Sequence, residues 1–111
     1  MEKEYVYKLN NLLNVNGDFE QEFPKTEMLI NEVVDSVRDL LISKNRAYGD
    51  SALKPANIFA TGDAVENLSA RIDDKLMRIK MRGIDDETED TVQDLIGYLI
   101  LLKIALRMEH E

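Results

Sequence analysis

The segment that most limits the fold is residues 95–106, LIGYLILLKIAL, which is apolar on nearly every face of a helix. In a small protein, such a helix must be surrounded on all sides by other elements. The stretch is well short of the roughly 18 to 20 residues that a membrane span needs. We therefore expect a central, buried helix near the end of the chain, within a small all-α bundle that has no membrane partner.

Helical spacing also predicts a first helix. Apolar residues recur with a helical period from Met28, and this pattern stops near Gly49. The loop that follows contains Ile58 and Phe59, which we expect to pack onto the core. Residues 1–25 mix helix, strand and turn signals, so their structure is left open.

Local capping signals bound a second helix. Asp63 followed by Glu66 has the spacing of an N-terminal cap with its return partner, and Gly83 supplies the helix stop. The acidic residues 85–90 suit the positive end of the next helix dipole. A third helix is therefore expected to follow them and to continue to about residue 108.

The three predicted helices form one domain, because 111 residues provide room for one hydrophobic core. We expect this domain over residues 1–111, with its helical core over residues 26–108. Three helices barely cover a helix that is apolar all round. We therefore favour a homo-oligomer in which residues 95–106 also pack against a second copy, as in the common twofold dimers. The alternative is that the other helices and the N-terminal segment cover this helix.

The formal net charge is −8, from 22 acidic and 14 basic residues. Binding to a nucleic-acid backbone by counterion release needs a wide face of Lys and Arg, which this composition does not provide. We therefore expect no broad nucleic-acid binding. A small anionic metabolite is compatible with a local cluster of bases.

Residue content excludes several kinds of catalytic site. The chain has no cysteine, which excludes disulfides, thiolate zinc sites and cysteine nucleophiles. Its single histidine is His110, and it contains no P-loop, dinucleotide or nucleophile-elbow signature. An enzyme of this sequence would rely on carboxylates and a metal. The lack of cysteine and of a basic, apolar leader also leads us to expect a cytoplasmic protein.

Four cations form one ridge on the second predicted helix, against the overall acidic charge. At about 100° per residue, their spacing keeps them within roughly 60° of one another. Such a ridge can bind a phosphate-bearing ligand or pair with carboxylates of a neighbouring helix, and the sequence leaves both open. The cationic ridge consists of Arg71, Lys75, Arg78 and Arg82.

A second candidate cluster lies at the end of the first predicted helix. Tyr48 can stack on a base, Lys44 can bind a phosphate, and Gly49 lets the backbone approach a ligand closely. The alternative is an ordinary helix C-terminus, with Gly49 as the left-handed cap and cations favoured by the dipole. The cluster comprises Lys44, Asn45, Arg46, Tyr48, Gly49, Asp50 and Ser51.

Asp90 and Asp94 are one helical turn apart, so their carboxylates face the same way. Paired acids of this kind can share Mg²⁺, with Asp74 of the second helix as a further metal ligand. They can equally neutralise the cationic ridge, which is the commoner fate of such acids.

The segments KNRAYGDSALKPANIF, ARIDDKLMRIK and DTVQDLIGYLILLKIA resemble the phage-borne family called nucleotide modification associated domain 1, over roughly residues 35–107. This resemblance implies a nucleotide ligand. The chain also looks distantly like the all-α MazG-like NTP pyrophosphohydrolases, which bind Mg²⁺ through helical acids. That second resemblance implies a metal-dependent hydrolysis that uses Asp74, Asp90 and Asp94.

Our first hypothesis is a phage-type protein that binds a nucleotide or nucleotide-derived signal, cyclic or ADP-ribose-like, and sequesters it without turnover in the infected bacterium. The alternative is a Mg²⁺-dependent nucleotide pyrophosphohydrolase, and a third hypothesis is a structural partner of a DNA-modifying enzyme. For the first hypothesis, Arg71, Lys75 and Arg78 are assigned to phosphate, Tyr48, Asn45 and Ser51 to base or ribose, and Asp74, Asp90 and Asp94 to the ligand or to ion pairs.

Overall fold

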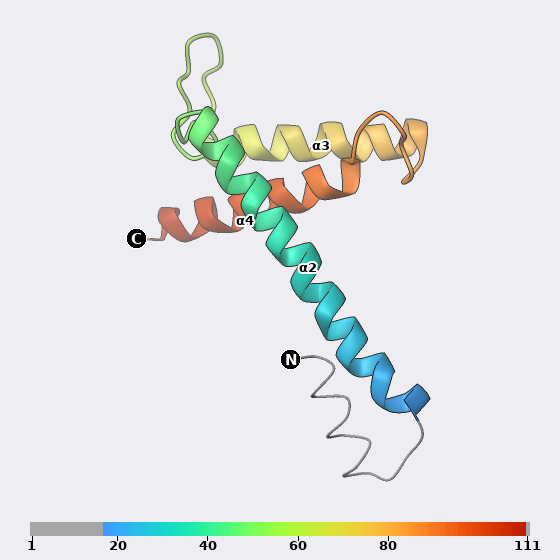
Figure 1. Cartoon of the computed structure of the whole chain (residues 1–111). Helices are drawn as coiled ribbons and strands as arrows, with labels where there is room; N and C mark the ends of the chain where they lie inside the picture. The colour runs from blue at the N-terminus through green and yellow to red at the C-terminus, as the bar shows by residue number, and fades with distance from the viewer. Residues whose placement is uncertain (1–16, 111) are drawn as a thin grey trace. The chain divides into compact units, whose positions relative to one another are not determined.

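The fold is all-α, as predicted. The computed structural model describes residues 17–110, and their side chains from residue 25 onward. The described residues contain three helices, joined by loops, and no strand: α2 (Gly17–Ala47), α3 (Ala64–Arg82) and α4 (Thr91–Glu109) (Figure 1).

Helix α2 is longer than the sequence pattern indicated. It ends at Ala47, close to the predicted end near Gly49, but it begins at Gly17 rather than near Met28. It therefore extends into the segment whose structure the sequence left open, and residues 1–16 lie outside the described part of the chain.

The chain divides into two compact units, Met1–Arg38 and Asp39–Glu111. Helix α2 runs from the first unit into the second, so its C-terminal turns belong with α3 and α4. All of the candidate site residues lie in the second unit. The expectation of one domain over residues 1–111 stays a prediction.

Both ends of α3 have the caps that the sequence predicted. The Asp63 carboxylate accepts a hydrogen bond from the Glu66 backbone N–H at 2.8 Å, and the Glu66 carboxylate accepts one from the Asp63 N–H at 3.3 Å. At the other end, Gly83 has φ +85° and donates its N–H to the carbonyl of Ile79. These local bonds satisfy backbone groups that the helix itself leaves unpaired.

Helices α3 and α4 run antiparallel, side by side, within the second unit (Figure 1). Their contact buries Leu68 of α3 with Leu101 and Ala105 of α4. Partly buried side chains pack around this small core, among them Leu41 from the end of α2 and Tyr98. The core therefore holds the C-terminal turns of α2 against the α3–α4 hairpin.

The loop between α2 and α3 departs from the prediction. Ile58 is 80% exposed and Phe59 is 98% exposed, so the expectation that they pack onto the core is wrong. The loop projects beyond the end of α3 instead of folding back over it (Figure 1). The prediction used only the hydrophobicity of these two residues, whereas the path of a loop depends on its turns.

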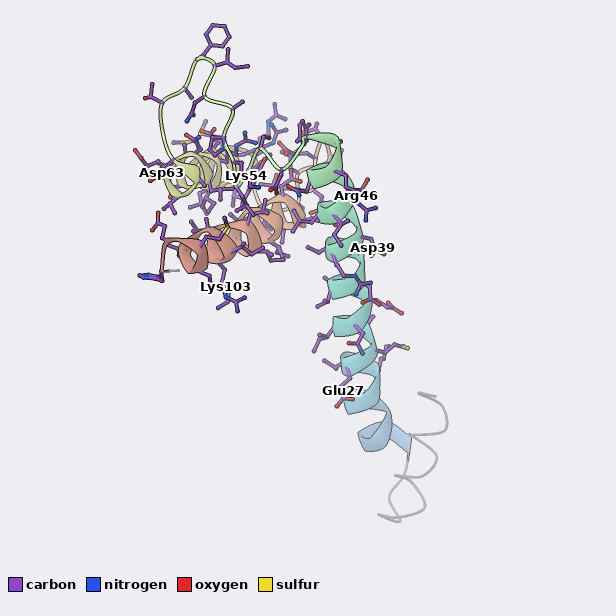
Figure 2. The ribbon with its side chains drawn as sticks, turned by 90° about the vertical axis from the view of Figure 1, so that its left-hand side faces the viewer. Glu27, Asp39, Arg46, Lys54, Asp63 and Lys103 are labelled. Carbon is purple, nitrogen blue, oxygen red and sulfur yellow. The ribbon has the colours of Figure 1, made fainter. Side chains whose placement is uncertain are left out.

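The outward face of α4 is apolar and exposed. Its residues recur at alternating intervals of four and three, the spacing of a coiled-coil seam. We call this set the α4 seam: Val92, Ile96, Leu99, Lys103 and Leu106. Leu99 is 48% exposed, and Lys103 points away from α3 (Figure 2). The described residues thus cover only one side of the helix that we expected to be surrounded.

Among the described helices, none combines the length and the apolar character that crossing a membrane requires.

Candidate functional site

The strongest candidate site is a cavity of about 180 Å³ where the end of α2 meets α3 and α4. It brings together five residues that the sequence placed in two separate clusters. They are joined by Tyr98 and by apolar neighbours. We call it the tyrosine cavity, and its lining is Leu41, Lys44, Asn45, Tyr48, Ser51, Ala52, Arg71, Tyr98 and Leu101.

The turn after α2 shapes one wall of this cavity. Gly49 and Asp50 have φ angles of +61° and +65°, in the left-handed region that ends many helices. The Asn45 side-chain amide donates to the Asp50 carboxylate at 3.1 Å and holds this turn. The chain then reverses and places Ser51 on the cavity wall. Gly49 and Asp50 themselves are not among the lining residues. They form the turn that ends α2, while their neighbours Tyr48 and Ser51 line the cavity, so the predicted helix cap and the predicted binding cluster occur together.

Arg71 is the member of the cationic ridge that lines the tyrosine cavity. Its guanidinium carbon lies 5.9 Å from the centre of the Tyr98 ring, within cation–π distance. Among the described residues no carboxylate forms an ion pair with Arg71. It therefore presents an uncompensated positive charge beside two tyrosines.

Tyr98 is a site residue that the sequence analysis did not select. It was included in the apolar run of residues 95–106 and was interpreted as part of a buried helix. One signal could have found it, because Tyr98 is the only aromatic residue within α4.

Lys75 and Arg78, in contrast, are occupied by ion pairs. The Lys75 ammonium lies 2.7 Å from the Glu89 carboxylate and 3.1 Å from that of Asp94. The hydrogen bond to Glu89 is the largest cause of a raised Lys75 pKa, partly opposed by desolvation. Arg78 pairs with Asp86 at 2.7 Å and with Glu89.

The Arg78–Asp86 pair closes the loop between α3 and α4. The Asp86 side chain is only 2% exposed and accepts hydrogen bonds from the Thr88 hydroxyl and backbone N–H. These bonds, followed by the one from Arg78, hold the pKa of the Asp86 carboxyl well below its usual range. Asp86 and Glu89 were interpreted only as dipole partners of the next helix, so their role in pairing with the ridge was missed.

Asp94 connects three helices. Besides Lys75 of α3, its carboxylate faces the Lys44 ammonium at the end of α2, 3.7 Å away. Burial favours its neutral form, but hydrogen bonds with Glu89 and Lys75 and the nearby lysine charges outweigh burial and lower its pKa. This arrangement corresponds to the ion-pair alternative for Asp94.

The three acids considered as Mg²⁺ ligands have separate surroundings. Asp90 caps α4 by accepting a hydrogen bond from the Gln93 N–H at 2.9 Å, while Asp74 is exposed on α3. In the described range, no group of three or more acidic or histidine side chains is placed to hold a metal ion. Thr91 follows Asp90, and its buried hydroxyl has no hydrogen-bond partner in that range.

A second cavity, of about 320 Å³, lies beside the first and is lined by the loop between α2 and α3 together with residues of α3. It shares Ser51, Ala52 and Arg71 with the tyrosine cavity. We call it the loop cavity, and its lining is Ser51, Ala52, Pro55, Ala56, Asn57, Ile58, Phe59, Ala60, Asn67, Leu68 and Arg71.

No protein-family model, curated protein or solved structure matches this chain.

Proposed function

We propose that the tyrosine cavity binds a nucleotide-type ligand without turning it over. The observation that carries the proposal is the uncompensated Arg71 guanidinium beside Tyr48 and Tyr98 in one cavity. A guanidinium binds phosphate through paired hydrogen bonds, and flat aromatic rings favour contact with a base. Asn45 and Ser51 add polar groups for a ribose or base edge.

Lys44 is the second phosphate contact in this proposal. It lies on the cavity wall and is 53% exposed, and its 3.7 Å separation from Asp94 is too long for a good hydrogen bond. Lys44 can therefore donate to a phosphate. Lys75 and Arg78, also assigned to phosphate on sequence grounds, would have to leave short ion pairs first.

Binding without hydrolysis is favoured by the surroundings of the acids. A Mg²⁺ site for pyrophosphate chemistry needs several carboxylates that converge on one or two ions. Asp94 is engaged by Lys75, and Asp90 is engaged as a helix cap. These contacts support a role in which the acids position the ridge and the hairpin.

We further propose that the protein acts in the cytoplasm of a phage-infected bacterium, where it sequesters a nucleotide or nucleotide-derived signal of the host. This setting rests on the resemblance of residues 44–51, 71–78 and 90–99 to the phage-borne family. Sequestration requires only tight binding and no catalytic group.

The test is calorimetric titration with nucleoside mono-, di- and triphosphates and cyclic dinucleotides, with and without Mg²⁺, followed by analysis of the recovered ligand. Arg71→Ala should lower the affinity roughly ten- to a hundredfold, since a hydrogen bond to a charged group contributes about 1.5–3 kcal/mol. Intact ligand should be recovered from every titration. Cleavage that needs Mg²⁺ would contradict binding without turnover.

Arg82→Ala is the matched control for Arg71→Ala. Arg82 belongs to the same ridge, lines neither cavity and forms no ion pair within the described part of the chain. Equal effects of the two substitutions would show that general positive charge, and not the cavity, attracts the ligand.

We also propose that the protein is a homo-oligomer in which the α4 seam packs against a second copy. An antiparallel pairing centred on Leu99 would place Val92 opposite Leu106 of the other copy and cover the exposed apolar face. The seam is then self-complementary, as a twofold interface requires. Lys103 interrupts it, and a single lysine at such a position selects one register at some cost in stability.

A further inference from the structure

The two cavities are adjacent and share part of their lining. Ser51, Ala52 and Arg71 line both the tyrosine cavity and the loop cavity. Arg71 thus presents its positive charge to both cavities. A ligand that spans both would have its central part against this guanidinium.

The sizes of the cavities favour a ligand that occupies both. Ligand sites usually measure about 300–1,000 Å³. The tyrosine cavity, at about 180 Å³, is smaller than this range, and the loop cavity, at about 320 Å³, is at its lower limit. Together they fall well within the range.

The loop cavity has features of a site for a flat ring. Ile58 and Phe59 line it and are otherwise in solvent, so a ring stacked on them would remove apolar surface from water. Asn67 donates its amide hydrogen to the carbonyl of Gly62 at 3.3 Å, and among the described residues its side-chain oxygen accepts no hydrogen bond. That oxygen can accept one from the exocyclic amine of a base.

We infer that the ligand is a dinucleotide, with one base in each cavity and the linking phosphate on Arg71. This inference rests on the proposed function, because it assumes nucleotide binding in the tyrosine cavity. It adds the loop cavity as a second base site. It also gives Arg71 a central position that a mononucleotide would not require.

The test compares the four common nucleoside 5′-monophosphates with the corresponding linear homodinucleotides by calorimetric titration of the full chain. At least one dinucleotide should bind ten times more tightly, or better, than its monophosphate. Ala60→Trp, at an exposed position that lines only the loop cavity, should lower dinucleotide affinity at least tenfold and leave monophosphate affinity unchanged. Tyr48→Ala, which alters only the tyrosine cavity, should weaken both.

Ala70→Trp is the matched control, since Ala70 is exposed on α3 and lines neither cavity. Phe59→Ser provides a second variant of the loop cavity and should also weaken only the dinucleotide. Equal affinities for monophosphate and dinucleotide would overturn this inference and leave the proposed function standing. The same holds if neither Ala60→Trp nor Phe59→Ser changes the dinucleotide affinity. If no nucleotide binds the unmodified protein, both are wrong.

Discussion

Arg71 and Lys75 are neighbours on one ridge of α3, yet they have opposite surroundings. Lys75 faces Glu89 and Asp94, whereas Arg71 faces the Tyr98 ring. The ridge itself follows from residue spacing, which the sequence shows directly. Which of its cations remains available depends on acids that lie on the following loop and helix, and spacing within one helix cannot reveal that.

Asp86 is the residue whose ionisation should affect stability most clearly. Its pKa is lowered from the ordinary value of 3.8, so its carboxylate stabilises the fold above about pH 4, and this stabilisation is lost as the pH falls further. Asp86→Asn removes this dependence. We expect the variant to be less stable than the unmodified protein near pH 6, with a smaller difference near pH 3, when thermal unfolding is followed by circular dichroism.

Asp85→Asn is the control for this measurement, because Asp85 is the exposed neighbour of Asp86 in the same loop. It should leave the pH profile of the unfolding temperature unchanged. A constant difference between Asp86→Asn and the unmodified protein at all pH values would show that the charge of Asp86 is not responsible.

Most of the polar residues that line the tyrosine cavity could be selected from the sequence, but the cavity that they form could not be predicted. Lys44, Asn45, Tyr48 and Ser51 stood out as one cluster and Arg71 as part of another, and only the fold shows that they share a cavity. Arg71 is far from the other four residues along the chain, and whether it meets them depends on how α2 ends and how α3 packs. Tyr98 was missed because its apolar neighbours indicated a core position.

At the scale of the helices, α3 depends on its capping box. We expect Asp63→Ala to lower the free energy of unfolding by about 0.5–2 kcal/mol, since it leaves the Glu66 backbone N–H without its acceptor. Urea denaturation measures this change. Asp73→Ala, an exposed change in the middle of the same helix, should remain within about 0.5 kcal/mol of the unmodified protein. Similar losses in the two variants would contradict the role of the cap.

A helix end can be predicted from the sequence when residues close to it in the chain determine it. Asp63, Glu66 and Gly83 act on backbone groups within a turn of themselves, so the limits of α3 were predicted correctly. The start of α2 at Gly17 and the exposure of Phe59 have no comparable capping signal in the sequence. Hydrophobic residues alone could not predict either.

At the scale of the whole molecule, the proposed oligomer gives a direct prediction. Leu99→Glu should shift the protein from an oligomer to a monomer in size-exclusion chromatography with light scattering, because it places a charge at the centre of the α4 seam. Met81→Glu is the control, since Met81 is also apolar and exposed but lies on α3. A monomeric unmodified protein, or dissociation by both substitutions, would contradict the role assigned to the seam.

The position of Asp94 between Lys44 and Lys75 has a consequence for how binding would be communicated. Lys44 lines the tyrosine cavity and also faces Asp94, so in the proposed complex a phosphate would compete with Asp94 for the same ammonium group. If the phosphate took Lys44, Asp94 would keep only Lys75 as a cationic partner among the described residues, and the α3–α4 hairpin would lose one ionic contact with α2. By thermodynamic reciprocity, if phosphate binding weakens the Lys44–Asp94 contact by some factor, then forming that contact weakens phosphate binding by the same factor. In the proposed complex, the phosphate would therefore take over from Asp94 the task of joining Lys44 of α2 to the hairpin, through Arg71 of α3.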